Sequence, residues 1–203
     1  MCGIRPGGIF VPEHIYVIGS NSFSGAYFVR HALEAGYAVS GVSRSPEPHG
    51  VYLPYLDKDG RHPDRFRFLQ ADLNHDLDAV MAALEQDKPA YIVNFAAQGM
   101  VAESWQNPGQ WLRTNTLSPV LLHDRLRRHS WLKKFVQAST PEVYGSTSGT
   151  IAENTYYAPS TPYAVSKAAV DMSLTAFQRA YGFPVAFTRA ANVYGPGQLL
   201  YRI

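Results

Sequence analysis

Short runs of β-branched and aromatic residues alternate with longer amphipathic stretches from His14 to Thr188. The short runs predict strands at residues 14–18, 37–42, 66–70, 91–95, 135–138 and 185–188. The longer stretches place apolar residues at three-and-four spacing and predict helices at about 25–35, 77–87, 109–129 and 162–181. Several strand runs are apolar throughout, which is typical of strands covered on both faces. The pattern therefore predicts an α/β fold of the Rossmann type, with a doubly wound parallel sheet.

Two segments interrupt this alternation. Residues 43–64 are polar and contain four prolines, so we expect a long loop, and loops of that length in compact domains are often functional. A second irregular segment covers residues 141–160. The last helix should begin at Thr161 and Pro162, because threonine can cap the free amides and proline fits the first helical position.

Composition narrows the class of protein. The 203 residues suit one large domain, and 46% hydrophobic against 17% charged residues indicates a folded chain. A net charge of +2 is too small to indicate a nucleic-acid or membrane partner, and no apolar run approaches the roughly 18 residues of a membrane span. Cys2 is the only cysteine and the seven histidines lack metal-ligand spacing, so we expect no disulfide, no metal and a cytoplasmic location.

A glycine-containing turn, Gly19-Ser20-Asn21-Ser22-Phe23-Ser24-Gly25, follows the first predicted strand and opens a helix. Glycines there let the backbone approach a pyrophosphate, and the helix amides then face it. The candidate cofactor-binding residues are Gly19, Asn21, Ser22, Phe23 and Gly25. Ser22 stands where a third glycine is expected, and an ordinary tight turn would explain the glycine pair equally well.

The ends of the next two strands carry the second part of a dinucleotide signal. A carboxylate after the second strand would mark a bond to the ribose of NAD, but Ser43 and Arg44 stand there instead. They can hold a 2′-phosphate, so the cofactor is NAD or NADP with NADP favoured; an ordinary loop arginine is the alternative. Asp72 and Leu73 follow the third strand, where Asp72 can accept from the adenine or cap the next turn.

Tyr163 and Lys167 lie four residues apart at the start of the last predicted helix, hence on one face. A tyrosine with a pKa near 10 needs a shift of roughly 3 units, about 4 kcal/mol, to act as a base near neutrality. A fixed ammonium and a cationic nicotinamide can supply it. Such a pair is also common on solvated helices, but here the preceding strand ends in Ser139-Thr140, which offers a third hydroxyl.

Five motifs in this order resemble the extended short-chain dehydrogenase/reductases, within them the NAD-dependent epimerases and dehydratases, and among these the dTDP-glucose and GDP-mannose 4,6-dehydratases. They are the glycine turn, Asn94-Phe95-Ala96-Ala97-Gln98, Ala138-Ser139-Thr140-Pro141-Glu142-Val143-Tyr144-Gly145, Tyr163 with Lys167, and Arg189-Ala190-Ala191-Asn192-Val193-Tyr194-Gly195-Pro196-Gly197. The resemblance covers the chain from His14 onward.

The resemblance implies a nucleotide-sugar 4,6-dehydratase whose catalytic residues are Thr140, Glu142, Tyr163 and Lys167. Tyr163 would take the proton of the sugar 4-hydroxyl while hydride passes to the nicotinamide, Lys167 would hold the ribose, and Thr140 would bond the 4-oxygen. Glu142 would then remove the C5 proton so that water leaves from C6. Pro141 stands where dTDP-glucose dehydratases have a proton-donating aspartate, although GDP-mannose dehydratases also lack it.

The same resemblance implies a nucleotide-diphosphate sugar as substrate. Its contacts would come from Gln98, Ser104, Thr140, Glu142 and Asn192, while the small Ala96 and Ala97 would pack against the cofactor. For Gln98 and Ser104 the alternative is bonding within their own loop. Like Asn192, Arg189 matches the segment that in this family approaches the hexose and phosphates of the substrate, and the alternative for Arg189 is a structural ion pair.

The resemblance also sets expectations for domains and assembly. We expect a leader at residues 1–13, a dinucleotide-binding domain at 14–203, and a truncated substrate lobe that starts at about 190–203. A homodimer through a four-helix interface that includes the last helix is implied as well. An epimerase, a decarboxylase or a 4-keto reductase of the same family, and a truncated non-catalytic dinucleotide-binding module, remain as alternatives.

Overall fold

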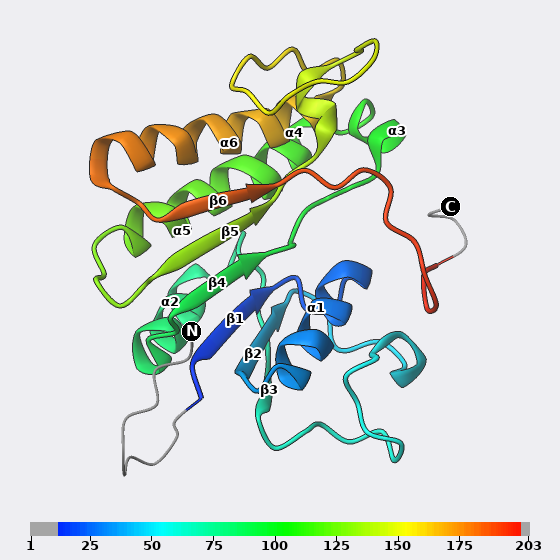
Figure 1. Cartoon of the computed structure of the whole chain (residues 1–203), viewed down its shortest axis with the longest axis vertical. Helices are drawn as coiled ribbons and strands as arrows, with labels where there is room; N and C mark the ends of the chain where they lie inside the picture. The colour runs from blue at the N-terminus through cyan, green and yellow to red at the C-terminus, as the bar shows by residue number, and fades with distance from the viewer. Residues whose placement is uncertain (1–11, 200–203) are drawn as a thin grey trace.

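The computed structural model describes residues 12–199. It has six strands that form one parallel sheet (Figure 1) in the order β3-β2-β1-β4-β5-β6. They are β1 (His14–Ile18), β2 (Ala38–Ser43), β3 (Phe66–Gln70), β4 (Tyr91–Asn94), β5 (Lys134–Ala138) and β6 (Val185–Thr188). This is the strand order of the doubly wound dinucleotide-binding fold, so the predicted fold class is confirmed.

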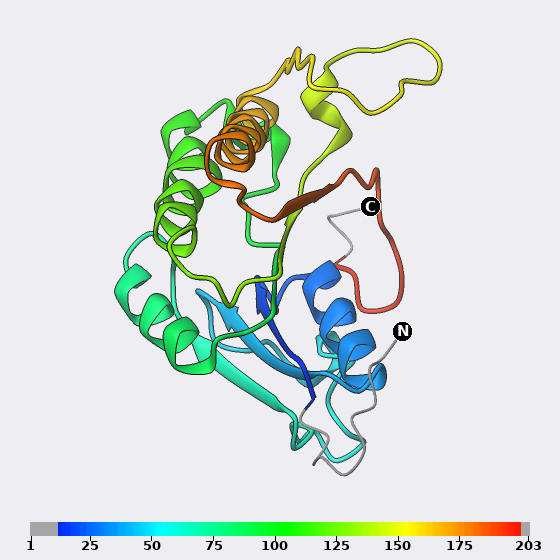
Figure 2. The same cartoon turned by 60° about the vertical axis from the view of Figure 1, so that its left-hand side comes forward.

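The helices form layers on both faces of the sheet. They are α1 (Phe23–Glu34), α2 (Leu77–Asp87), α3 (Val101–Ser104), α4 (Pro108–Leu112), α5 (Ser118–Leu126) and α6 (Pro162–Tyr181). Figure 2 shows α2, α5 and α6 on one side and α1 on the other. Val80, Leu122 and Leu174 bury one face of the sheet, while Val29 and the loop residue Tyr55 bury the other. These two apolar layers fix the sheet that positions the strand ends.

The predicted helix at 109–129 is divided in the structure. A π-helical turn, η2 (Arg113–Leu117), separates α4 from α5, and the amide of Ser118 donates to the carbonyl of Arg113. Pro119 has no N–H for the carbonyl four residues earlier and its ring crowds that carbonyl. The wider turn before Pro119 relieves this conflict. Two short 3₁₀ helices, η1 (Gly50–Tyr52) and η3 (Pro141–Tyr144), lie in the segments that were expected to be irregular.

The chain ends are described only in part. Of the predicted leader, residues 1–11 lie outside the described residues, as do residues 200–203 of the predicted substrate lobe. Glu13 belongs to the body of the protein, since its carboxylate accepts from the hydroxyl of Tyr91 and the ammonium of Lys133. Within residues 12–199, no helix is both long enough and apolar enough to cross a membrane. In the same range, no three His, Cys, Asp or Glu side chains gather as metal ligands would.

Candidate active site

All six strands are parallel, so their carboxyl ends lie along one edge of the sheet. The sequence motifs follow these ends: the glycine turn after β1, Ser43 and Arg44 after β2, Asp72 after β3, residues 96–98 after β4, Thr140 after β5 and residues 189–197 after β6. The order of the strands reverses between β1 and β4, and ligands of such folds bind outside the strand ends at that point. The fold therefore gathers every predicted site segment at one edge.

The glycine turn leaves no room for side chains at its two ends. A Cβ on Gly19 would lie 2.6 Å from the amide nitrogen of Ala96, and Gly19 has a φ of +84°. A Cβ on Gly25 would lie 2.2 Å from the carbonyl oxygen of Gly19. Both glycines are thus required by the close approach of β1, α1 and the loop after β4.

Ser22 caps α1 in place of the expected third glycine. Its hydroxyl accepts from the amide of Gly25 at 3.1 Å and donates to the carbonyl of Gly19 at 2.7 Å. The amides of Phe23 and Ser24 donate to no group within the described residues. The first turn of α1 therefore keeps two free N–H groups and a bare backbone surface, and this arrangement fits the pyrophosphate of a dinucleotide.

Ser43 and Arg44 are in different situations at the end of β2. Ser43 is buried, and its hydroxyl accepts from the amide of Asn21 at 3.0 Å, so it joins β2 to the glycine turn. Asn21 also donates from its side chain to the carbonyls of Ser45 and Pro46. Arg44 is exposed, and its guanidinium has no partner in the part of the chain that the structure describes. Only Arg44 of this pair presents a free charge to a ligand.

Asp72 shows the capping geometry that was the alternative for it. One carboxylate oxygen accepts from the backbone and side-chain amides of Asn74, both at 2.9 Å. No hydrogen bond within the described residues occupies its other oxygen, so that oxygen keeps its capacity to accept one from an adenine. Leu73 packs against the core below it.

Helix α6 presents Tyr163 and Lys167 from its first turns. Thr161 caps the helix by accepting from the amide of Ala164, as predicted. Lys167 is buried, and its ammonium donates to the carbonyl of Ala138 at 2.6 Å. Burial lowers the pKa of Lys167 to about 8. The helix thus delivers a desolvated ammonium beside the end of β5.

Ser104 shows the bonding within its own segment that was the alternative to a substrate contact. It is fully buried, donates to the carbonyl of Val101 at 2.6 Å and accepts from the amide of Tyr163 at 3.1 Å. It presents no exposed surface to a sugar. The hydroxyl instead fixes the first turn of α6, and therefore the backbone of Tyr163.

Thr140 and Glu142 lie on the segment that leaves β5. The hydroxyl of Thr140 accepts from the amide of Glu142 at 3.3 Å and so caps η3, in which Pro141 takes the first position. The Glu142 side chain is exposed and has no hydrogen-bond or ion-pair partner among residues 12–199. Desolvation nevertheless raises its pKa above the ordinary value.

The loop after β4 is held by a residue that the sequence reasoning missed. Asn115, in the π-helical turn, accepts from the amide of Gln98 and donates to its carbonyl and to the hydroxyl of Ser166. The side-chain oxygen of Gln98 is buried without a partner in the described range. Ala96 is half-buried and Ala97 exposed beside it. A local motif does not reveal Asn115, because its partners lie 17 and 51 residues away.

The segment after β6 crosses back to α1 (Figure 1). The hydroxyl of Tyr27 donates to the carbonyl of Pro196 at 2.8 Å, and a Cβ on Gly195 would lie 3.3 Å from the ring of Phe23. Asn192 is exposed in this segment and free of hydrogen bonds within the described chain. Arg189, by contrast, forms an ion pair with buried Asp171 at 2.6 Å, which is the structural alternative stated for it.

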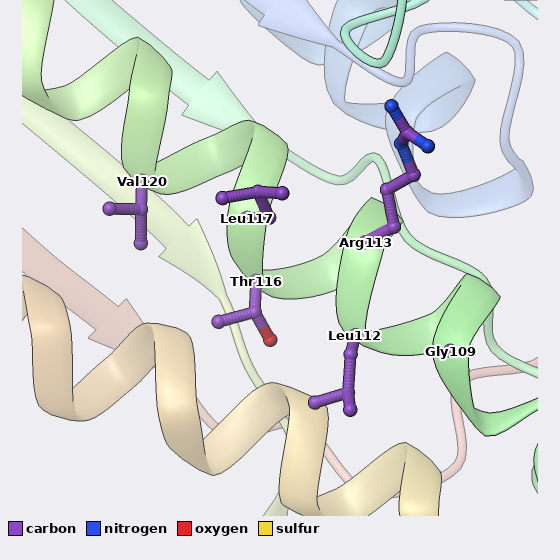
Figure 3. Close-up of a pocket in the computed structure, with 6 residues that line it drawn as sticks. All are labelled: Gly109, Leu112, Arg113, Thr116, Leu117 and Val120. Carbon is purple, nitrogen blue, oxygen red and sulfur yellow. The ribbon is translucent and has the colours of Figure 1, made fainter.

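A groove of about 620 Å³ lies along α4, η2 and α5 (Figure 3). Its lining residues are Gly109, Leu112, Arg113, Thr116, Leu117 and Val120. None of the predicted site residues lines it. The groove is therefore formed by residues of α4, η2 and α5 and by none of the predicted site residues.

Comparisons with known proteins match most of the chain. The family described as GDP-mannose 4,6 dehydratase matches residues 16–200. The chain is 35% identical over 195 residues to a dTDP-glucose 4,6-dehydratase of Streptomyces antibioticus, covering 91% of this chain and 55% of that protein. It is 32% identical over 200 residues to one from Neisseria gonorrhoeae, covering 92% and 56%. The chain thus spans about half the length of these relatives.

Solved structures give the same result. A dTDP-glucose 4,6-dehydratase of Bacillus anthracis in complex with NAD is similar with a TM-score of 0.77 and 28% identity, over 92% of this chain and 57% of that one. A UDP-glucose 4-epimerase of Thermotoga maritima with UDP-glucose gives 0.76 and 27%, over 93% and 58%. The chain therefore belongs to the GDP-mannose 4,6-dehydratase family, among the NAD-dependent nucleotide-sugar dehydratases and epimerases of the short-chain dehydrogenase/reductase type.

Proposed function

We propose that this chain carries the cofactor site and the catalytic residues of a nucleotide-sugar 4,6-dehydratase. The observation that carries the proposal is the meeting of Thr140, Glu142 and the Tyr163–Lys167 helix with the glycine turn at one edge of the sheet. A bound NAD or NADP would supply the hydride acceptor for C4 of the sugar and the donor that returns it. The relatives named as dTDP-glucose 4,6-dehydratases support this reaction class.

The first chemical task is removal of the 4-hydroxyl proton, which we assign to Tyr163. Lys167 supports this role because a cation stabilises a nearby phenolate and so lowers its pKa. With a pKa of about 8, Lys167 is mainly charged at neutral pH. Its bond to the Ala138 carbonyl uses one of three N–H donors, which leaves two for ribose hydroxyls. Thr140 would hold the 4-oxygen in place.

The second task is removal of the C5 proton, which we assign to Glu142. Its carboxylate has no partner within the described residues, and its raised pKa makes it a better base than an ordinary glutamate. Gln98 and Asn192 would contact the sugar nucleotide, because a buried unpartnered oxygen and an exposed amide both remain available there. These three residues line successive segments of the same edge.

An epimerase of the same family is the second candidate. The UDP-glucose 4-epimerase of Thermotoga maritima is as similar in structure as the dehydratase, and Pro141 has no proton to give to a leaving hydroxyl. Product analysis separates the two reactions. A dehydratase yields a 4-keto sugar that lacks one water, whereas an epimerase yields an isomer of unchanged mass.

The cofactor preference follows from Arg44. Similar structures contain NAD, but the exposed guanidinium of Arg44 has no partner among residues 12–199 and suits a 2′-phosphate. We therefore expect Arg44→Gln to lower the NADP-to-NAD affinity ratio by about tenfold, or about 1.4 kcal/mol. Titration calorimetry measures both affinities, and Arg179→Gln on exposed α6 surface is the matched control. An unchanged ratio would remove Arg44 from cofactor selection.

The experiment that tests the proposal is a single-turnover assay with nucleotide sugars. The purified chain with dinucleotide is mixed with a dTDP- or GDP-linked hexose, and reduced nicotinamide is followed by near-ultraviolet absorbance. Tyr163→Phe should slow C4 oxidation by about 10² to 10⁴-fold while dinucleotide affinity stays within about threefold. Tyr156→Phe, on an exposed loop, is the control. Oxidation at the wild-type rate in Tyr163→Phe would refute the assignment.

We also propose that the chain forms a homodimer through its outer helical face. Exposed large aliphatic side chains on α4, η2, α5 and α6 are Leu112, Leu117, Leu121, Val165 and Met172. The two helical segments are neighbours, since the hydroxyl of Thr116 donates to the carbonyl of Ser166. The groove beside Leu112 and Leu117 adds a concave apolar surface (Figure 3). A second copy would bury this patch.

A further inference from the structure

A cluster of buried charges lies directly behind the candidate site. Lys167 and Asp171 are on successive turns of α6, and Arg189 is the first residue after β6. Asp171 is fully buried, and the Arg189 side chain is only 11% exposed. Sequence patterns gave Asp171 no role, because an acid within an amphipathic helix is ordinarily solvated.

The carboxylate of Asp171 joins segments that are distant in sequence. One oxygen, Oδ2, accepts from the hydroxyl of Ser139 at 2.5 Å and from Nη1 of Arg189 at 2.6 Å. Ser139 immediately precedes Thr140, and Ser139 donates its amide to the carbonyl of Thr188. The ends of β5, β6 and the middle of α6 therefore meet at a single oxygen atom.

Arg189 extends this connection to the segment that bears Glu142. Its Nε donates to the hydroxyl of Tyr144 at 3.0 Å, and Tyr144 is in the same 3₁₀ helix as Glu142. Its Nη2 donates to the hydroxyl of Tyr157 at 2.7 Å, in the loop that leads to α6. The guanidinium thus fixes three groups, and Asp171 fixes the guanidinium.

The second oxygen of Asp171, Oδ1, is buried without a partner within the described residues. A buried acceptor without a partner is uncommon in folded proteins and calls for an explanation. Its charge acts on Lys167, one helical turn earlier. The carboxylate of Asp171 raises the pKa of Lys167, whereas burial and the guanidinium of Arg189 lower it. Asp171 and Arg189 therefore act in opposite directions on the pKa of Lys167.

We propose that Asp171 is the positioning residue of this site: it holds Ser139 and Arg189, and through them Thr140 and Glu142, in register with a charged Lys167. The inference rests on the proposed function for the roles of Thr140, Glu142 and Lys167. Its electrostatic part does not need that function, because it concerns Lys167 in the free protein.

The test is an NMR titration of the lysine side chains in the unliganded chain. The sequence contains five lysines, and the Lys167 signal is assigned by its loss in Lys167→Arg. Asp171→Asn should lower the pKa of Lys167 by about one unit, because the opposing charge is removed. Arg189→Gln should raise it, and the double variant should return it close to the wild-type value.

Opposite shifts separate this role from simple loss of packing, which would move all three variants in one direction. If Asp171→Asn does not fold, Arg189→Gln and the charge-balanced double variant still decide the outcome. The proposal would be overturned if Arg189→Gln left the pKa of Lys167 unchanged. It would also be overturned if the double variant did not bring that pKa back close to the wild-type value.

A second readout is the pH profile of C4 oxidation. Asp171→Asn should reduce the rate up to about tenfold above pH 8 with little change in KM, because a Lys167 pKa lowered by one unit leaves about a tenth of the charged form there. The rate should recover toward lower pH as Lys167 regains its proton, and Asp171→Glu should rescue it in part. Absence of oxidation in the wild type together with the predicted NMR shifts would reject the proposed function and support the positioning role. Normal oxidation together with an unshifted Lys167 would reject the positioning role alone.

Discussion

At the scale of the residue, Glu142 is the side chain whose chemistry is most directly testable. Glu142→Gln keeps size and removes the base, so we expect C4 oxidation to continue while exchange of the C5 proton with solvent deuterium falls about 10² to 10⁴-fold. Its raised pKa adds a pH dependence, because a protonated carboxyl cannot accept a proton. Exchange should therefore decline with falling pH, starting above the ordinary range of a glutamate.

Deuterium incorporation at C5, measured by mass spectrometry of the recovered sugar, reports this step. Glu153→Gln, on an exposed loop of the same region, should exchange like the wild type. If Glu142→Gln exchanged at the wild-type rate, the base would be another group.

The candidate residues that sequence can suggest are those whose proposed role depends on local spacing. Tyr163 and Lys167 share a helix face, and Thr140 comes two residues after β5, so their neighbours in sequence suggest them as candidates. The roles of Ser104 and Asn115 depend on partners 59 and 51 residues away, and sequence gave no indication of those pairs. Two interpretations of Arg189 stayed open for the same reason. An arginine that follows a strand can contact a ligand or pair with a buried acid, and only the fold shows which of the two groups is near.

At the scale of the element, the β1-α1 turn depends on Gly25. Gly25→Ala would place a Cβ 2.2 Å from the carbonyl oxygen of Gly19, so the turn must shift. We expect a loss of about 1–3 kcal/mol of unfolding free energy, typical of overpacking, and a dinucleotide affinity at least about tenfold weaker. Chemical denaturation and titration calorimetry measure the two effects.

Gly109→Ala is the matched control for this change. A Cβ there meets nothing within 4 Å, and the residue lies in α4. Alanine should therefore stabilise the helix by about 0.5–1 kcal/mol. Equal effects of the two substitutions would show that the close approach at Gly25 does not constrain the turn.

His123 makes the packing of α5 on the sheet sensitive to pH. Its ring is fully buried, contacts Phe135 with centroids 4.7 Å apart, and has no hydrogen-bond partner at either nitrogen in the described residues. Burial lowers its pKa to about 3. The unfolded state, with a pKa near 6.5, binds the proton first as pH falls, so the free energy of unfolding decreases from about pH 6.5 downward.

The expected loss is about 1.4 kcal/mol for each pH unit below 6.5. His123→Leu should abolish that part of the slope. Denaturant unfolding at about pH 7.0 and about pH 5.5 measures it, because the lower value lies roughly one unit below the pKa of free histidine. His75→Leu, at an exposed position, should keep the wild-type slope. Identical slopes for His123→Leu and the wild type would mean that His123 is not buried as a neutral ring.

The elements themselves were largely predictable, because the strands of a parallel sheet that is covered on both faces are short and apolar throughout. The bounds of β1, β3, β6, α2 and α6 agree with the predicted ranges. The stretch at 109–129 kept its apolar period through the π-helical turn, so periodicity alone gave one helix there. Pro119 was the local signal that this helix is divided. Its presence did not reveal that the backbone before it would form a π-helical turn and not end the helix.

At the scale of the whole molecule, the arrangement separates two surfaces. The strand ends and the segment after β6 form the candidate active site, while α4, α5 and α6 present apolar side chains on their outer faces. Lys167 is buried on the inner face of α6, whereas Met172 on its outer face is 60% exposed. The helix that bears the catalytic candidates would therefore also join two copies. Assembly would then stiffen α6 and, through it, the Tyr163–Lys167 pair.

The homodimer gives the last prediction. Light scattering of the wild-type chain should report about 45 kDa, twice the 22.5 kDa of one copy. Met172→Glu and Leu121→Glu each place a charge in the apolar patch, and because Met, Leu and Glu have similar helix propensities the fold should persist while the mass falls to that of one copy. Val51→Glu, at a position 65% exposed in the loop on the other face of the sheet, should leave the dimer intact. A wild-type chain with the mass of one copy at assay concentration would contradict the homodimer and leave the outer face of α6 exposed to solvent. Only the contacts of α6 with its own chain, such as those with α5 and η2, would then restrain this helix.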